Sequence, residues 1–217
     1  MVQIGRINKL TVKRIRDYDV YLDGGELGDI LLPLLELPEN CQVNDEVEVF
    51  VYNESEGRLQ ATIQTPRVMV GQVAKLQVVT NATTGSYLNW GLKKDLFAPR
   101  SQQLVKMEEG QSYVIFVFLD KRSNRITASS KLDKLLSQEP PRYAEGEEVD
   151  LLIYDTTDLG YKAVVNKTHG GMLYKNEVFQ KVVVGQSMKG FIKKVREDGK
   201  IDLILQQSGY QGVDDIS

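Results

Sequence analysis

Short runs in which apolar and polar residues alternate make up most of the chain, and turn-forming residues separate these runs at regular intervals. Residues 47–51, 113–117 and 201–205 are rich in β-branched and aromatic side chains, a composition typical of half-buried strands. One stretch, residues 131–137, has a good helical pattern, and two consecutive prolines soon after it would end a helix there. The pattern therefore predicts an all-β protein with a short helical linker.

The predicted strands recur in three similar units. A glycine opens each unit, and a second glycine or an asparagine follows it 39 positions later. These pairs are Gly5 and Asn44, Gly71 and Gly110, and Gly146 and Gly185. Later in each unit comes a two-residue turn, at Glu56-Gly57, Ser123-Asn124 and Asp198-Gly199. Glycine and asparagine tolerate the positive φ of tight hairpins, so each unit is expected to contain three strands, a connector and two more strands.

Five strands of this length can close into a small barrel, which leaves no exposed sheet edge. A five-stranded Greek-key barrel is the OB-fold, and its sheet face suits oligonucleotides. We therefore expect three tandem OB-fold barrels at residues 1–66, 67–136 and 143–207, followed by a tail at residues 208–217.

The second predicted strand of each unit carries tyrosines close to a common position. The three phrases are Tyr18-Asp19-Val20-Tyr21, Thr84-Gly85-Ser86-Tyr87 and Leu159-Gly160-Tyr161-Lys162. They resemble the aromatic–Gly–Ala–aromatic phrase of the ribosomal protein S-one type RNA-binding domain, which is an OB-fold. In that family a Gly-Leu-x-His phrase follows on strand three, and the two aromatics and the histidine form the RNA face. Here the histidine position holds Leu32, Ala98 and Tyr174, of which only the tyrosine could stack on a base.

Three such units in tandem, with Asp-Leu-Phe-Ala-Pro at residues 95–99, are similar to the conserved virulence factor B family of bacteria. In that family three S-one type domains precede a C-terminal winged helix. The resemblance implies RNA binding and a regulatory role in gene expression and virulence. The single cysteine and the N-terminus without the apolar core of a signal peptide fit a cytoplasmic location. The sequence ends without the winged helix, so we expect either a truncated or a shortened member.

Charge is spread unevenly, although the net charge of the 217 residues is only −3. Residues 4–64 hold 6 Lys/Arg and 12 Asp/Glu, whereas residues 70–134 hold 10 and 5. Residues 162–200 hold 9 Lys/Arg and 3 Asp/Glu. Because phosphate binding needs clustered cations, the second and third units are predicted to bind single-stranded RNA. The acidic first unit is predicted to favour a protein partner.

Bases of a single strand stack on exposed aromatic rings, so tyrosines and tryptophans beside cations are the candidates for the RNA surface. The candidates are Arg14, Arg16, Tyr18 and Tyr21 in the first unit, Tyr87, Trp90, Lys93 and Lys94 in the second, and Tyr161, Lys162, Lys167, His169, Tyr174 and Lys175 in the third.

Each candidate has a structural alternative. Any single strand tyrosine is at least as often a half-buried packing residue, and Trp90 is slightly better explained as the cap of a barrel end. Tyr18 and Tyr21 lie three positions apart, so both face RNA only if a bulge separates them. His169, beside two glycines, fits a turn.

Nothing in the sequence indicates catalysis. The one cysteine and the one histidine fall in different units, and no phosphate-binding loop, dinucleotide glycine pattern or EF-hand loop is present. We therefore expect no enzyme activity, no cofactor, no metal and no membrane span. The competing function class is a protein–protein scaffold, because OB-type barrels also bind proteins.

Overall fold

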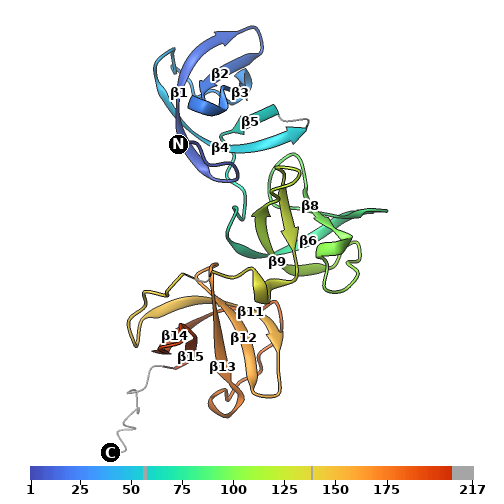
Figure 1. Cartoon of the computed structure of the whole chain (residues 1–217), viewed down its shortest axis with the longest axis vertical. Coiled ribbons are helices and arrows are strands. Elements are labelled where there is room, and N and C mark those ends of the chain that lie inside the picture. Colours follow the sequence, from blue (N-terminus) through green and yellow to red (C-terminus); the bar gives the residue numbers. More distant parts are fainter. Residues whose placement is uncertain (56–57, 138, 207–217) are drawn as a thin grey trace, which may run out of the picture. The chain divides into compact units, whose positions relative to one another are not determined.

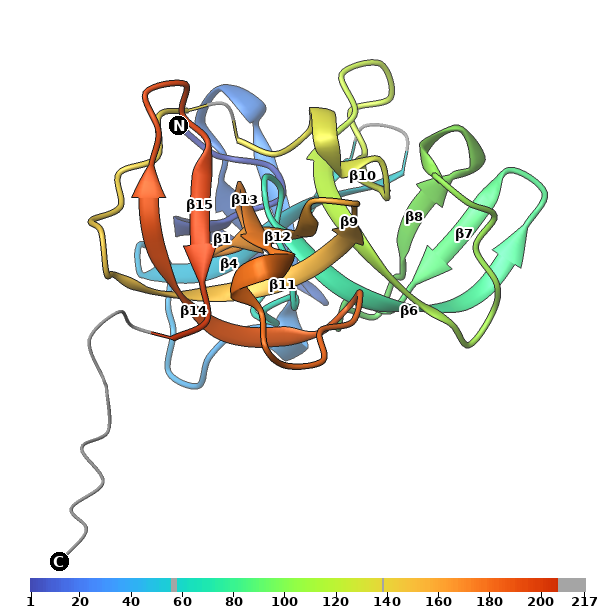
Figure 2. The ribbon, with the colours of Figure 1, turned by 90° about the horizontal axis from the view of Figure 1, so that it is seen from below.

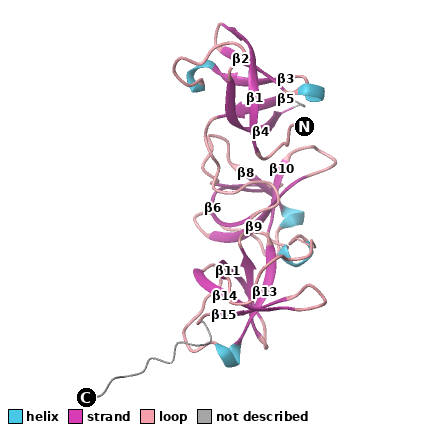
Figure 3. Ribbon diagram, turned by 90° about the vertical axis from the view of Figure 1, so that its left-hand side faces the viewer, coloured by secondary structure: helices cyan, strands magenta, loops and turns pink. Residues whose placement is uncertain are grey.

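The computed structural model describes residues 1–55, 58–137 and 139–206. Within these ranges the chain forms strands joined by loops, and its helical segments are short 3-10 turns (Figures 1 and 3). The strands make three closed five-stranded barrels, so the predicted all-β fold of tandem OB-type barrels is confirmed.

The elements follow the same order in each barrel. The first barrel contains β1 (Ile7–Arg16), β2 (Asp19–Asp23), η1 (Gly25–Leu27), β3 (Asp29–Pro33), η2 (Leu34–Glu36), β4 (Glu46–Ser55) and β5 (Arg58–Thr62). The second contains β6 (Val73–Ala82), β7 (Gly85–Leu88), β8 (Leu96–Pro99), η3 (Arg100–Gln102), β9 (Ser112–Leu119) and β10 (Ile126–Ser129). After η4 (Leu132–Lys134), the third contains β11 (Glu148–Thr156), β12 (Gly160–Val165), β13 (His169–Tyr174), η5 (Lys175–Glu177), β14 (Ser187–Val195) and β15 (Ile201–Ile204).

Strand pairing is also shared. In each barrel the first strand pairs with the second and the fourth, and the third strand pairs in parallel with the fifth to close the barrel. The six landmark residues of the repeat all adopt a positive φ, between 76° for Asn44 and 84° for Gly185. The repeat spacing therefore reflects two left-handed turn positions per barrel, which only glycine and asparagine occupy at low cost. The predicted turn at Glu56-Gly57 lies outside the described residues.

A β-bulge interrupts the first strand of every barrel at the same place. The register shifts between Val12 and Arg14, between Val78 and Thr80, and between Ile153 and Asp155. The bulge considered between Tyr18 and Tyr21 is not there, because residues 17 and 18 form a turn and β2 begins only at Asp19. Tyr18 is therefore a turn residue with 85% of its surface exposed.

The chain divides into two compact units, residues 1–132 and the part from Asp133 onward. The first unit holds two barrels that share apolar packing, since Phe50 of β4 is fully buried in the core cluster of the second barrel. Its ring meets Trp90 edge-on, with ring centroids 5.6 Å apart.

The helix predicted at residues 131–137 is wrong, because only the single turn η4 forms there. Seven residues are too few to offset the cost of nucleating an isolated helix. Leu136 is instead buried, and the Ser137 N–H donates a hydrogen bond to the Thr168 carbonyl, so tertiary contacts hold this linker. None of the described helical segments is long and apolar enough to cross a membrane.

Candidate nucleic-acid interface

In each barrel, five residues on the strand face turned away from that barrel's own core pair directly across the strands, and we call this set the outer row. Not all of them are open to solvent, since Thr127 is buried and Tyr52 packs against the core of the second barrel. The first outer row is Arg14, Tyr21, Leu31, Gln60 and Tyr52. The second is Thr80, Tyr87, Phe97, Thr127 and Phe118. The third is Asp155, Lys162, Met172, Asp202 and Lys194. The three rows occupy equivalent positions, so their chemistry can be compared directly.

The first outer row combines an aromatic ring with a cation. The Arg14 guanidinium lies over the Tyr21 ring, 4.1 Å from its centroid. Arg14 also contacts Asp29 at 2.6 Å, and Lys13, the bulge residue of β1, contacts the same carboxylate at 3.0 Å. The hydrogen bond from Lys13 and the charge of Arg14 hold the pKa of Asp29 below its usual value. This carboxylate offsets part of the positive charge beside Tyr21.

The second outer row is aromatic. Tyr87 of β7 and Phe97 of β8 pair across the strands, with ring centroids 5.1 Å apart and planes tilted by 42° (strands in Figure 2). Both rings are half-buried, so each retains surface that a base can reach. The loop of residues 89–95, which joins these strands, carries Lys93 and Lys94.

Most cations of the second barrel have no carboxylate partner within the described residues. Leaving Lys94 aside, no Lys or Arg of residues 70–134 takes part in an ion pair within the described ranges. The third barrel differs, because five of the nine cations in residues 162–200 are paired. Positive charge is therefore available to phosphates mainly on the second barrel.

In the third outer row, Lys162 is paired with the linker that precedes its barrel. Lys162 contacts Asp133 of the linker at 3.0 Å and Asp155 at 3.3 Å, and the Tyr154 hydroxyl donates a hydrogen bond to Asp133. The hydrogen bond to Asp133 raises the pKa of Lys162. Burial alone would raise the pKa of Asp133, but the hydrogen bonds from Lys162 and Tyr154 outweigh burial and lower it. Burial and the Asp133 charge raise the pKa of Tyr154.

Further along, the linker packs on β13. A side chain placed on Gly170 would meet Leu136 at 3.2 Å, and the Tyr143 hydroxyl lies 2.9 Å from Nδ1 of His169. The Tyr143 and His169 rings also meet edge-on. His169 thus begins β13 and packs against Tyr143, so it does not lie in a turn.

Two tyrosines of the third barrel lie elsewhere than predicted. Tyr161 packs against the barrel core, and Lys162 occupies the position that corresponds to Tyr21 and Tyr87, because a shift of one residue along a strand reverses the face. Leu173, which is fully buried, corresponds to Leu32 and Ala98, so Tyr174 does not occupy the histidine position of the family.

The remaining candidates of the third barrel lie at the two ends of β13. The Tyr174 hydroxyl donates a hydrogen bond to Asp202 and accepts one from Arg196. Lys167 lies in the exposed turn between β12 and β13, with a φ of 65°, and Lys175 is exposed in η5. The structure therefore does not bring the six predicted residues of this barrel into one surface.

Trp90 is not available for stacking, because only 4% of its surface is exposed. Its indole N–H donates a hydrogen bond to the Lys94 carbonyl at 2.6 Å, and its own carbonyl accepts one from the Arg67 N–H. The alternative role as an apolar cap fits this burial, and the indole also fixes the loop that carries Lys93. In the first barrel Arg16 is exposed at the end of β1, beside the turn that holds Tyr18.

Phe97 and Phe118 are outer-row residues that the sequence reasoning missed. The signal was present in the alternation of Leu96, Phe97 and Ala98, in which the first and the third residue are buried. A period of two places Phe97 on the opposite face from its two neighbours.

The chain is similar to three known proteins or protein families. A model described as the S1 domain matches residues 4–64, which contain the first barrel. The chain is 24% identical over 208 residues to the uncharacterized protein YitL of Bacillus subtilis (strain 168), covering 90% of this chain and 68% of that protein. A crystal structure of a multidomain protein with nucleic acid binding domains from Streptococcus pneumoniae TIGR4 aligns with a TM-score of 0.51 at 18% identity, over 94% of this chain and 74% of its own.

The structural similarity supports the tandem-barrel fold, and the S1 domain match agrees with the resemblance seen in the sequence. None of the three descriptions names the conserved virulence factor B family, so that part of the resemblance stays a prediction.

Proposed function

We propose that this protein binds single-stranded RNA, principally through the outer row of the second barrel, and that it acts as a cytoplasmic regulator of gene expression rather than as an enzyme. The observation that carries the proposal is the Tyr87–Phe97 pair near Lys93, which takes part in no ion pair within the described part of the chain. The S1 domain match and the nucleic acid binding domains of the pneumococcal neighbour support a nucleic-acid role.

The second barrel supplies both contributions to the free energy of single-stranded RNA binding, namely base stacking and phosphate contacts. A base stacked on an aromatic side chain contributes about 1–3 kcal/mol, largely without regard to its identity. Phosphates add a salt-dependent term for each cation that they contact. Leu88 pairs with Leu96 directly beside the Tyr87–Phe97 pair, so the loop carrying Lys93 begins one residue from the aromatic surface. An RNA strand whose bases stack on these two rings would therefore pass close to this loop.

The first barrel fits a secondary role. Tyr21 supplies a ring and Arg14 a planar cation, on which a base can also stack. Asp29 offsets the positive charge of Arg14, and residues 4–64 as a whole are acidic, so we expect weaker phosphate binding than on the second barrel.

The test is fluorescence anisotropy of a labelled single-stranded RNA titrated with the full chain. Tyr87→Leu removes the aromatic ring and should weaken binding roughly 5- to 150-fold, the equivalent of one stacked base. Tyr87→Phe keeps the ring and should bind within about twofold of the wild type. If three or four phosphates are contacted, log K should fall with log salt concentration with a slope of about −2 to −3.

Absence of RNA binding at low salt would refute the proposal and favour the protein scaffold. Equal affinities of Tyr87→Leu and Tyr87→Phe would show that RNA binds, but not by stacking on this row. Circular dichroism of each variant provides the control for folding, because Tyr87 also packs on Phe97.

A further inference from the structure

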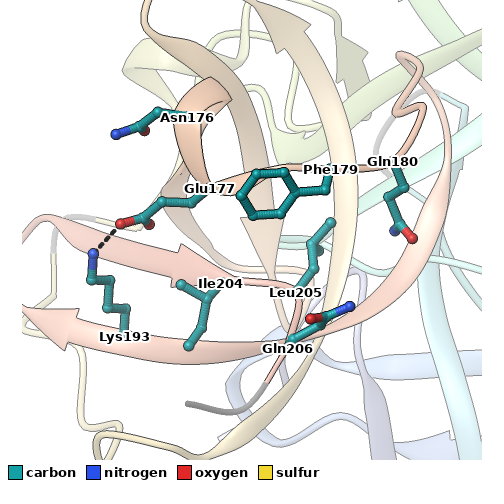
Figure 4. A pocket seen from close by; sticks show the side chains of 8 residues that line it. All are labelled: Asn176, Glu177, Phe179, Gln180, Lys193, Ile204, Leu205 and Gln206. Carbon is teal, nitrogen blue, oxygen red and sulfur yellow. Dashed lines mark hydrogen bonds and ion pairs between the residues drawn. The ribbon is translucent and has the colours of Figure 1, made fainter. Parts of the chain in front are cut away.

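Beside η5 of the third barrel lies an open cavity of about 590 Å³ (Figure 4). None of its lining residues belongs to an outer row. Phe179, Ile204 and Leu205 supply apolar surface, and 91% of the Phe179 surface is exposed. A phenylalanine so exposed contributes nothing to the barrel core, so its ring is free to contact a ligand.

Polar groups of the cavity suit hydrogen bonding to a heterocycle. Asn176, Gln180 and Gln206 line it, and each amide offers both donors and acceptors. Glu177 and Lys193 form an ion pair across one side (Figure 4). An aromatic ring with several amides is the combination that recognises an unstacked base of single-stranded RNA.

Cations flank the cavity on both sides of its lining segment. Lys175 precedes and Lys181 follows residues 176–180, and both side chains are exposed. Neither lysine takes part in an ion pair within the described part of the chain. A nucleotide whose base enters the cavity would therefore leave its phosphates near unpaired positive charge.

We propose that this cavity binds one unstacked nucleobase of the RNA, with the base against the Phe179 ring and its edge on the amides. The inference rests on the proposed function and extends it to a second site. The linker pairs with Lys162 of the outer row and packs on His169, so it occupies part of the strand surface of the third barrel. This barrel therefore contributes to binding through its side at η5.

The experiment uses the full chain and an RNA of about 30 nucleotides, long enough to occupy more than one barrel. Phe179→Ala should weaken binding roughly 5- to 150-fold, and Phe179→Trp, which restores a stacking ring, should bind at least as tightly as the wild type. Because Phe179 is exposed, both variants should unfold at the wild-type temperature. Photocrosslinking of RNA containing 4-thiouridine, followed by mass spectrometry, should label residues 176–181.

The outcomes separate this inference from the proposed function. If Phe179→Ala binds RNA as the wild type does while Tyr87→Leu does not, the cavity does not bind a base and a protein contact is favoured, whereas the proposed function stands. If Phe179→Ala weakens binding and the crosslink maps to residues 176–181, the cavity site is supported whatever Tyr87→Leu shows. If the wild type binds no RNA, both proposals fall together.

Discussion

Phe50 offers a direct test of whether the first two barrels fold as one unit. The residue belongs to β4 of the first barrel, yet it is fully buried in the core cluster of the second and meets Trp90 edge-on. Truncating a buried phenylalanine to alanine costs about 3–5 kcal/mol, because apolar contacts are lost and a cavity remains. An aromatic edge contact contributes about 0.5–1.5 kcal/mol of such a loss. We therefore expect Phe50→Ala to destabilise both barrels by about 4 kcal/mol.

Trp90 is the only tryptophan of the chain, so its fluorescence reports on the second barrel alone. In urea, with a slope of about 2 kcal/mol per molar, a loss of about 4 kcal/mol lowers the Trp90 unfolding midpoint by about 2 M. The matched control is Phe179→Ala, the same substitution at an exposed position of the other unit, which should leave the Trp90 transition unchanged. A Trp90 midpoint shifted by less than about 0.3 M in Phe50→Ala would refute the shared core.

Three further outcomes follow from the third barrel. Asp133→Asn removes the ion pair with Lys162 and should cost about 0.2–1 kcal/mol, seen as faster hydrogen exchange of the Ser137 amide. The folded pKa of Asp133 is lowered and that of Lys162 is raised. Stability from the pair is therefore lost as pH falls from 3.8 through the lowered pKa of Asp133, or rises from 10.5 through the raised pKa of Lys162. Thermal melts across pH should show smaller acid and alkaline losses in Asp133→Asn than in the wild type, because Lys162 keeps its ion pair with Asp155. Gly160→Ala would place Cβ 2.0 Å from the Leu173 carbonyl oxygen and should destabilise this barrel by about 1–3 kcal/mol, so an unchanged melting temperature would contradict the close approach.

The repeat could be predicted from sequence because turns impose strict residue preferences. The 39-residue spacing from Gly5 to Asn44 recurs since both positions adopt a positive φ, which few residue types tolerate. Strand pairing then follows from chain order in a five-stranded barrel. The linker could not be predicted in the same way, because its conformation depends on contacts such as that of Ser137 with Thr168, more than 30 positions away.

The candidate site was predicted less well, because it depends on which face a side chain occupies. Tyr21 and Tyr87 lie in outer rows as expected, whereas Tyr161 lies on the core side, one residue out of phase. Trp90 shows a second difficulty, since a large aromatic beside lysines could be a stacking platform or a core residue. Sequence proximity to cations does not separate these two roles, whereas burial does.

A count of charged residues along the sequence predicts phosphate binding less well than the charge that remains after ion pairs are taken into account. The segment 162–200 has an excess of cations, but Lys162, Lys189 and Arg196 are neutralised by carboxylates. The carboxylates of Asp133, Asp150 and Asp202 lie outside the counted segment, so its charge count misses them. Lys94 apart, the lysines and arginines of the second barrel take part in no ion pair among the described residues, so this barrel retains most of its positive charge. Since only unpaired cations gain a partner when phosphates arrive, the salt dependence of RNA binding should change more on removing Lys93 than on removing Lys162.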